Sequence, residues 1–366
     1  MAELALLVVG PATRATGGVA RFLAEQRRRL PAEVAVEVHD NAAGLAPSGG
    51  RLGTALASLR AMAGFARRRR PDVVHVHTSH GLAFYRSSWY VFVASVLWRR
   101  PVVVHVHGSS FDTFAADTSP LAVGFQRLTF GLADRVIALS EGWRDVLADR
   151  VDDAKLVVVP NAIDPEEYRP CYGADPPVVA FVSNLIERKG VRELVAAVER
   201  LDGGDLQVRI AGDGPLAPLV ADLAERSSNV DYRGYVTEAE KRRLVETASA
   251  FVLPTHAEGL PIALLEGMAG GNAVITTDVD AIPEVVDERS GWLVPPRDVD
   301  ALLGALRAFA AEPGRAEAMG RHNRAIVEER FAWPVVVDRL LAVYRSVTGA
   351  ADPSSPVPAP EPVTDS

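Results

Sequence analysis

Short apolar runs rich in Val, Ile and Leu alternate with amphipathic stretches of helical length through the first half of the chain. Strands that are buried on both faces read as such runs, and the stretches between them are long enough to be helices that cover a sheet. The alternation therefore predicts a doubly wound α/β domain with a parallel sheet. The predicted strands are 4–9, 34–39, 72–77, 101–107, 135–139 and 155–159.

The alternation starts again at Val178 and predicts a second doubly wound unit. Its predicted strands are 178–183, 206–211, 230–234, 250–253 and 273–276, its predicted helices are 191–201, 215–226, 238–248 and 261–269, and further helical stretches follow at 299–311, 315–330 and 334–348.

The domain organisation follows from the break between these two patterns. Residues 161–177 contain four prolines and show no clear periodicity. We predict an N-terminal Rossmann-like domain, a linker, a second Rossmann-like domain, a final helix and a disordered tail rich in Pro, Ser and acidic residues. Their predicted bounds are 1–165, 166–176, 177–332, 333–348 and 349–366.

Composition is that of a globular protein of two domains. The chain has 366 residues, of which 48% are hydrophobic and 23% charged, which excludes extensive disorder. The single cysteine, Cys171, cannot form an internal disulfide and indicates a reducing compartment, so we expect a cytoplasmic location. The apolar run after Glu3 is too short to span a bilayer and lacks the basic residues of a signal peptide.

Charge is unevenly distributed along the chain. Residues 1–165 contain 19 Lys and Arg residues against 15 Asp and Glu residues, whereas the whole chain has a net charge of −8. The clusters Arg27–Arg29 and 67–70 are either solvated helix ends or a surface that meets anionic lipid or a phosphorylated acceptor. The aromatic stretch 82–98 is likewise either a core helix or an interfacial helix. Nucleic acid is not expected as a partner, because basic and aromatic residues are not interleaved.

A pair of glycines, Gly17 and Gly18, follows the first predicted strand and opens a helix. Paired glycines let the backbone approach a ligand, and the N–H groups of a helix start favour a diphosphate. A tight turn explains the pair equally well, and the G-x-G-x-x-G dinucleotide fingerprint is absent there.

Two predicted strands each end in a His-x-His pair, His75 with His77 and His105 with His107. Residues two apart lie on the same face of a strand. A metal site is conceivable, but no acidic residue is placed to complete it, so we expect none. His75 and His105 fall inside the strands and suit packing, whereas His77 and His107 fall at strand ends. His107, which precedes a polar loop containing Ser109, is the stronger functional candidate.

Two cations, Arg188 and Lys189, stand between the first strand of the second unit and the helix that follows. Cations at a helix N-terminus oppose the helix dipole unless an anion joins them. A diphosphate would resolve that conflict, and a solvated turn is the alternative.

Two carboxylates, Glu258 and Glu266, flank the start of another predicted helix. Carboxylates accept hydrogen bonds from hydroxyl groups, so the pair suits a polyhydroxylated ligand. The backbone N–H groups of Gly259 and Leu260 at the helix start could face a phosphate or a sugar.

Two Asp-x-Asp strings occur further along the chain. Either pair could hold a divalent metal, but Asp298 reads as an N-cap, so we expect no metal at Asp278 with Asp280 or at Asp298 with Asp300.

Together, these segments resemble the retaining glycosyltransferases of family 4. The resemblance covers about residues 4–348 and is carried by Gly17-Gly18-Val19, His107-Gly108, Pro160-Asn161 to Asp164, Arg188-Lys189-Gly190, 211–215 and, most specifically, Glu258-Gly-Leu-Pro to Glu266. It implies the GT-B fold, in which two Rossmann-like domains face each other across a cleft and the C-terminal helix crosses back to the first domain.

The resemblance also implies roles for single residues. Lys189 binds the donor diphosphate with help from Arg188, Glu266 holds the ribose, and Glu258 with the backbone of Gly259 and Leu260 holds the donor sugar. His107 lines the donor-sugar site, Gly17 and Gly18 close on the phosphates, and His77 and Ser109 are candidates for acceptor binding. One departure is Asn184, which stands where the family usually has an arginine.

The implied activity is the metal-independent transfer of a hexose, with retention, from a UDP- or GDP-sugar to an acceptor hydroxyl, without a bound cofactor. Such an enzyme would serve bacterial glycan, glycolipid or polysaccharide synthesis, with an acceptor that is either lipid-linked and reached at the inner face of the membrane or small and soluble. The alternatives are a non-catalytic subunit that binds a sugar nucleotide or acts as a scaffold, and a sugar-nucleotide epimerase of the same architecture.

Overall fold

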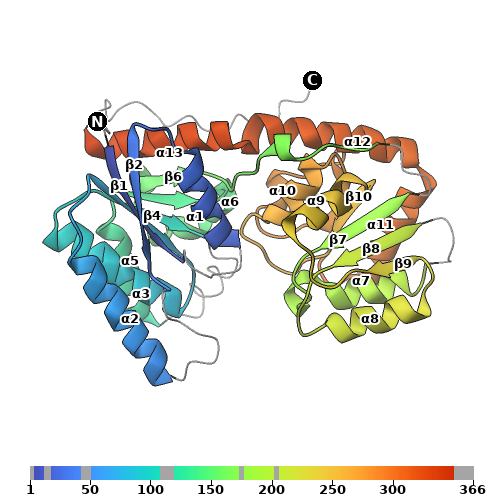
Figure 1. Ribbon diagram of the computed structural model, residues 1–366, viewed down its shortest axis with the longest axis horizontal. Coiled ribbons are helices and arrows are strands. Elements are labelled where there is room, and N and C mark those ends of the chain that lie inside the picture. Colours follow the sequence, from blue (N-terminus) through green and yellow to red (C-terminus); the bar gives the residue numbers. More distant parts are fainter. Residues whose placement is uncertain are drawn as a thin grey trace. The chain divides into compact units, whose positions relative to one another are not determined.

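The computed structural model describes residues 4–11, 18–42, 51–107, 119–172, 177–201 and 206–349 (Figure 1). The chain forms two compact units. Unit 1 consists of residues 1–161 and 334–366, and unit 2 consists of residues 162–333. The chain therefore passes between the units twice, and its last helix belongs to unit 1.

Unit 1 is built on a six-stranded parallel sheet in the order β2-β1-β3-β4-β5-β6. Right-handed crossovers place the helix after β1 on one face and the helices after β2, β3 and β4 on the other, because these connections run in opposite directions along the sheet. The strands are β1 (Leu4–Gly10), β2 (Val34–Asp40), β3 (Val73–Thr78), β4 (Val102–Val106), β5 (Arg135–Ala138) and β6 (Leu156–Val158). The helices are α1 (Gly18–Arg29), α2 (Arg51–Ala66), α3 (Leu82–Phe92) with its π-helical extension η1 (Val93–Leu97), α5 (Pro120–Gly131), α6 (Glu141–Ala148), the short η2 (Asp153–Lys155) and α13 (Trp333–Thr348).

Unit 2 repeats this architecture with the strand order β12-β11-β10-β7-β8-β9, again parallel throughout. Its strands are β7 (Val178–Val182), β8 (Gln207–Ala211), β9 (Val230–Tyr232), β10 (Ala250–Leu253), β11 (Ala273–Thr277) and β12 (Gly291–Val294). Its helices are η3 (Pro165–Glu167), η4 (Glu187–Lys189), α7 (Val191–Val198), α8 (Ala217–Arg226), α9 (Glu238–Glu246), α10 (Ile262–Ala269), η5 (Ile282–Glu284), α11 (Val299–Ala311), α12 (Pro313–Ile326) and η6 (Val327–Phe331).

The predicted strands are confirmed, with ends that differ by one or two residues. They could be predicted because most strands that lie inside a sheet are buried on both faces, as in β7, whose five residues are all buried. One strand, β12, was not predicted. A Cβ added to Gly291 at its start would lie 1.8 Å from the carbonyl oxygen of Val274, so glycine permits the close pairing with β11.

Two predicted helices are corrected in their details. The stretch 315–330 starts earlier, at Pro313, and its last turn widens into the π-helix η6. The aromatic stretch 82–98 is also not uniformly α-helical, since it widens into a π-helix from Val93 onward. The predicted N-cap Asp298 is confirmed, because its carboxylate accepts a hydrogen bond of 2.9 Å from the backbone N–H of Ala301.

Among the residues with a described structure, no helix is long and apolar enough to cross a membrane. The predicted tail lies outside the described residues except for Gly349.

Candidate donor site in unit 2 and histidine cluster in unit 1

The strand order of unit 2 reverses between β7 and β10, which are neighbours in the sheet. From β7 the chain proceeds outward to β8 and β9, whereas β10 begins the half that runs to β11 and β12. In open α/β sheets, ligands bind at such a switch point, beyond the carboxyl ends of the strands. Arg188 and Lys189 follow β7 and Glu258 follows β10, so the topology places both groups there.

The turn after β7 lies directly against the end of β10. Gly190 has a φ of 69°, and a Cβ at this position would lie 1.8 Å from the carbonyl oxygen of Pro254. The backbone N–H of His256 donates to the carbonyl of Arg188 at 2.8 Å. Glycine at 190 is therefore required both for the left-handed backbone and for the close approach of the two loops.

This approach brings the predicted cations and carboxylate together. Lys189 Nζ forms an ion pair with Glu258 Oε1, and both side chains are buried. Arg188 Nη1 lies 3.5 Å from Glu258 Oε2 and donates to the carbonyl of Ala257 at 2.6 Å. Two cations thus converge on one carboxylate at the switch point of unit 2.

The loop that carries Glu258 is fixed from two further sides. The carboxylate of Asp280, which follows β11, accepts a hydrogen bond of 2.5 Å from the backbone N–H of Glu258. Thr255 Oγ1 lies 3.0 Å from Glu258 Oε1, and the Thr277 hydroxyl donates to the carbonyl of Thr255 at 2.6 Å. The Glu258 carboxylate is thus held in one position by loops from three neighbouring strands.

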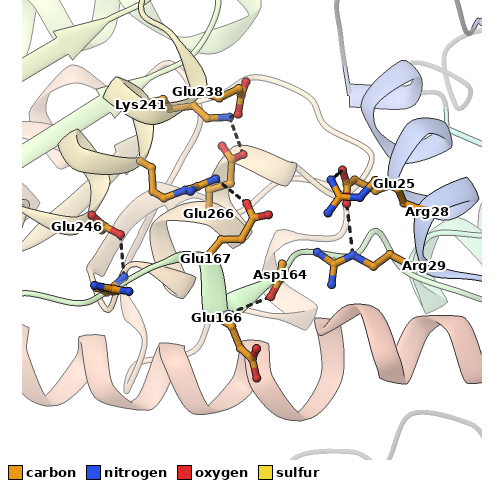
Figure 2. Close-up of polar contacts among 12 residues, drawn as sticks. Glu25, Arg28, Arg29, Asp164, Glu166, Glu167, Glu238, Lys241, Glu246 and Glu266 are labelled. Atoms are coloured by element: carbon orange, nitrogen blue, oxygen red, sulfur yellow. Dashed lines mark hydrogen bonds and ion pairs between the residues drawn. The ribbon is translucent and has the colours of Figure 1, made fainter.

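The second carboxylate, Glu266, lies in the first turns of α10 and is also buried. Lys241 of α9 donates from Nζ to Glu266 Oε1 at 2.7 Å and contacts Glu238 Oε2 at 2.8 Å (Figure 2). Helix α9 is itself fixed at its start by a capping box between Thr237 and Glu240. Lys241 therefore orients Glu266.

Four histidines gather on one face of the unit 1 sheet. His77 of β3 pairs in register with His105 of β4, which places His75, His77, His105 and His107 side by side. His77 Nδ1 lies 2.8 Å from His107 Nε2, and the ring of Phe22 from α1 lies against His77, His105 and His107.

The same face receives the last helix of the chain. Tyr344 of α13 places its hydroxyl 2.8 Å from His75 Nδ1, and Gln26 of α1 donates to this hydroxyl at 2.8 Å. Burial lowers the pKa of His75 and of His107 to about 3, and it lowers the pKa values of His77 and His105 well below their usual range. These imidazoles are therefore neutral at physiological pH.

Three of these histidines, His75, His77 and His105, place one ring nitrogen each within 4.8 Å of the others. The grouping contains no carboxylate, so a divalent cation would bring two uncompensated charges into a fully buried site. These three side chains are buried in the core of unit 1, and the absence of a metal there stays a prediction.

Both halves of the chain match models of known families. Residues 14–167 match the model described as Glycosyltransferase Family 4, and residues 176–312 match Glycosyl transferases group 1. The alpha-maltose-1-phosphate synthase of Mycobacterium tuberculosis is 30% identical over 319 residues, which span 78% of this chain and 76% of that protein. The chain belongs to glycosyltransferase family 4.

Further similar proteins agree with this assignment. The alpha-maltose-1-phosphate synthase of Mycolicibacterium smegmatis is 33% identical over 255 residues. These residues span 61% of this chain and 66%, just under two thirds, of that relative. Sucrose-phosphate synthase from Thermosynechococcus elongatus superimposes with a TM-score of 0.79 at 19% identity, over 95% of this chain and all of that one. Anabaena HepE, solved with UDP and glucose, gives 0.72 at 17% identity, over 94% of this chain and 100% of that one. The fold is GT-B, as expected.

The structure brings together some of the predicted site residues of the glycosyltransferase and not others. Arg188, Lys189 and Glu258 form one cluster, and Leu260 and Glu266 lie buried just beyond it in the chain. Gly18 is the first residue of α1, whereas Gly17 and Ser109 lie outside the described residues. His77 is buried beneath Phe22 rather than lying open at a strand end.

Sequence reasoning did not single out Thr255 or Lys241, and it considered Asp280 only as part of a metal-binding string. Asp280 has a φ of 51°, a conformation that aspartate adopts more readily than most residues. The sequence does show Asp280 as an acidic residue shortly after a predicted strand. Its contact with the Glu258 backbone could not be predicted, because that contact depends on the path of the loop.

A glycine pair tests the contact between the two loops of unit 2. Gly190→Ala adds a methyl group against Pro254, whereas Gly234→Ala adds one in open space at a similar φ of 62°. We expect Gly234→Ala to lower the free energy of unfolding by about 1 kcal/mol, from the left-handed backbone alone. Gly190→Ala should cost about 3 kcal/mol or more, because the clash must also be relieved. Urea unfolding measures both, and equal losses would contradict the contact.

The buried histidines predict a marked loss of stability in mild acid. Their folded-state pKa values lie below the unfolded value of about 6.5, so the unfolded chain takes up protons that the folded chain excludes as pH falls below that value. Each histidine should cost about 1.4 kcal/mol in total between about pH 7.5 and 5.5, and the four together about 5 kcal/mol. Unfolding free energies across this range measure the loss. His105→Phe should reduce the slope by about a fifth, because burial also lowers the pKa of His39 to about 4, and an unchanged slope would refute this origin.

Proposed function

We propose that this enzyme transfers a hexose from a nucleoside diphosphate sugar to an acceptor hydroxyl with retention at the anomeric carbon. The observation that carries the proposal is the buried Lys189–Glu258 pair at the switch point of unit 2, flanked by Arg188. A donor of this class offers a diphosphate to the cations and sugar hydroxyls to the carboxylate, which are the two chemistries that this cluster combines.

In this proposal, Lys189 and Arg188 hold the donor diphosphate. The pair matters most when the bond to the sugar breaks, because negative charge then develops on the leaving diphosphate. Two protein cations that are already fixed by Glu258 and the Ala257 carbonyl can stabilise this charge without a metal ion. Arg188 would thus replace the arginine that the family usually has where Asn184 stands.

The carboxylates hold the two sugars of the donor. Glu258 would accept hydrogen bonds from the hydroxyls of the transferred hexose, with the backbone N–H groups of Gly259 and Leu260 beside it. Glu266, which Lys241 holds through Oε1, would accept hydrogen bonds from the ribose.

For unit 1 we propose that His107 lines the donor-sugar site and that Gly17 and Gly18 approach the phosphates. The contact with His77 involves Nε2 of His107, so Nδ1 is the ring nitrogen that can meet a ligand. Because burial lowers the pKa of His107 to about 3, it would act as a neutral hydrogen-bonding group. His77 and Ser109 keep a proposed part in acceptor binding, His77 through its contact with His107.

The proposed reaction breaks the bond between the anomeric carbon and the diphosphate oxygen and forms a bond from the acceptor oxygen on the same face of the sugar. The acceptor proton passes to the departing phosphate oxygen. Resemblance to the family supports this front-face course, and the α-configuration in the names of two relatives agrees with retention.

We further propose that the enzyme works in the cytoplasm on a lipid-linked acceptor that it reaches at the inner face of the membrane. The exposed free thiol of Cys171 is consistent with a reducing compartment. Support for the membrane comes from the surface of unit 1 described in the next subsection.

A thermal-shift panel of UDP, GDP, ADP and TDP tests the donor site first. A ligand that binds only the folded state stabilises it by RT ln(1 + [L]/Kd), so the nucleotide that fits the site should raise the unfolding temperature selectively. The shift should persist in EDTA, since the cations of the site belong to the protein. If none of the four shifted the melting curve, the donor site would be refuted.

Two substitutions then separate the roles within the cluster. Lys189→Gln keeps a hydrogen-bond donor for Glu258 but removes the charge, so the affinity for the stabilising nucleotide should fall about tenfold or more. Arg192→Gln, which removes a cation from an exposed ion pair with Glu187, is the matched control and should change it less than about twofold. Calorimetry measures both, and equal affinities would rule out the role of Lys189.

Glu258→Gln should have the opposite profile. Turnover should fall by more than about tenfold, because the carboxylate no longer accepts hydrogen bonds from the transferred sugar, while nucleotide affinity is kept. Initial rates with the sugar nucleotide identified by the panel provide the measurement. Unchanged turnover would remove Glu258 from the mechanism.

A further inference from the structure

Exposed apolar side chains concentrate on one helical layer of unit 1. Of the twelve large hydrophobic residues that are exposed within the described ranges, ten belong to α2, α3 with η1, and α5. Leu82 is 82% exposed and Leu121 is 88% exposed. Soluble surfaces rarely gather apolar residues in this way unless the patch meets a partner or a membrane. The ten residues are Leu56, Leu59, Leu82, Tyr85, Phe92, Val96, Leu97, Leu121, Phe125 and Leu128.

These helices form one continuous layer, which we call the α2–α3–α5 face. Phe65 of α2 stacks on Trp98 at 4.5 Å between ring centroids and packs against Tyr90 of α3. On the other side of α3, the exposed ring of Tyr85 lies 5.6 Å from that of Phe125 on α5. Figure 1 shows the three helices side by side in unit 1.

The spacing of the exposed residues places them outward along each helix. Leu121, Phe125 and Leu128 are separated by four and then three residues, which is one face of α5. The inner face of the same helix carries Phe130, which is fully buried against Phe84. The outward apolar stripe is therefore additional to the stripe that holds the helix on the sheet.

The charge of this layer has a single sign. Residues 51–100 contain nine arginines and one acidic residue, although the whole chain is acidic, with a net charge of −8. That acid, Asp72, accepts a hydrogen bond from the backbone N–H of Ala5. The arginines stand beside the exposed apolar residues in sequence, as Arg60 follows Leu59, Arg86 follows Tyr85 and Arg127 precedes Leu128.

We propose that the α2–α3–α5 face docks on an anionic lipid bilayer. Apolar side chains that enter the region between headgroups and acyl chains, with arginines that reach the lipid phosphates, are the two components of interfacial binding. A protein partner with an acidic surface would match only the arginines of this layer, and one with an apolar surface would match only its apolar side chains. This inference deepens the proposed function, since it rests on an acceptor that is carried by the membrane.

The structure also corrects which residues the membrane meets. Arg27, Arg28 and Arg29 lie on α1, which the right-handed crossovers place on the opposite face of the sheet. Arg28 and Arg29 are moreover paired with Glu25 (Figure 2). Of the aromatic residues in the stretch 82–98, Tyr90 and Trp98 are buried, so Tyr85 and Phe92 are the ones available to lipid.

Vesicle co-sedimentation with the full-length protein tests the proposal. The protein should bind vesicles that contain about 30 mol% phosphatidylglycerol much more tightly than pure phosphatidylcholine vesicles, and salt should weaken the binding. The triple variant Leu121→Ser, Phe125→Ser, Leu128→Ser should bind the anionic vesicles about tenfold more weakly or worse. The double variant Arg60→Gln, Arg86→Gln should also lose about tenfold.

The matched control is Arg27→Gln with Arg28→Gln, which removes the same charge from α1 and should change vesicle binding less than about twofold. Binding of wild type to neither vesicle, or equal binding by the triple variant, would overturn the proposal. The competing occupant of this face is a second copy of the chain, and sedimentation velocity tests for it. A dimeric wild-type protein together with a monomeric triple variant would assign this face to the second copy and would also overturn the proposal.

The nucleotide-induced thermal shift is recorded in parallel for every variant. A retained shift shows that unit 2 is folded and that lost vesicle binding comes from the altered face. Conversely, a wild-type protein that binds vesicles but shows no thermal shift with any nucleotide would contradict the donor site without contradicting the membrane contact.

Discussion

The candidate donor site of unit 2 depends on one close backbone approach, the contact of the Gly190 turn with the carbonyl of Pro254. Neither Lys189 nor Glu258 would be stable in the interior alone, because a buried charge without a partner is costly. The left-handed glycine lets the turn after β7 settle on the end of β10, and the two side chains then neutralise each other. The position of Arg188 follows from the same contact, since its carbonyl is held by the N–H of His256.

The consequence for binding is that unit 2 presents its cations already ordered. Glu258 is fixed by Asp280 and Thr255, and Glu266 is fixed by Lys241, so little side-chain freedom is left to lose when a ligand binds. Preorganised charges of this kind stabilise a transition state more than mobile ones, because no reorganisation is needed when charge develops.

Most strands and the charged residues that follow them could be predicted from the sequence, because both sheets are parallel. Buried strands read as apolar runs, so all strands were found except β12, an edge strand that starts at Gly291 and whose two middle residues are not buried. Lys189 and Glu258 were found because each is a charged residue that comes shortly after an apolar strand. Asp280 could not be assigned to Glu258, because that contact depends on the path of a loop. The burial of His77 was also beyond reach, since it is set by Phe22 from a helix that precedes it by fifty residues or more.

The two units carry different physical constraints, and the charge asymmetry of the chain reflects them. In unit 2, the charged side chains of the candidate site are buried, where each must be paired. The exterior of this unit can be acidic without affecting the site. In unit 1, the histidine face is closed by α1 and α13 through Phe22 and Tyr344, which leaves the opposite face of the sheet to carry surface chemistry. Its helices need only one apolar stripe to hold them on the sheet. The second, outward stripe on α5 is not needed to hold the helix on the sheet, and it is the surface that the proposed membrane contact would use.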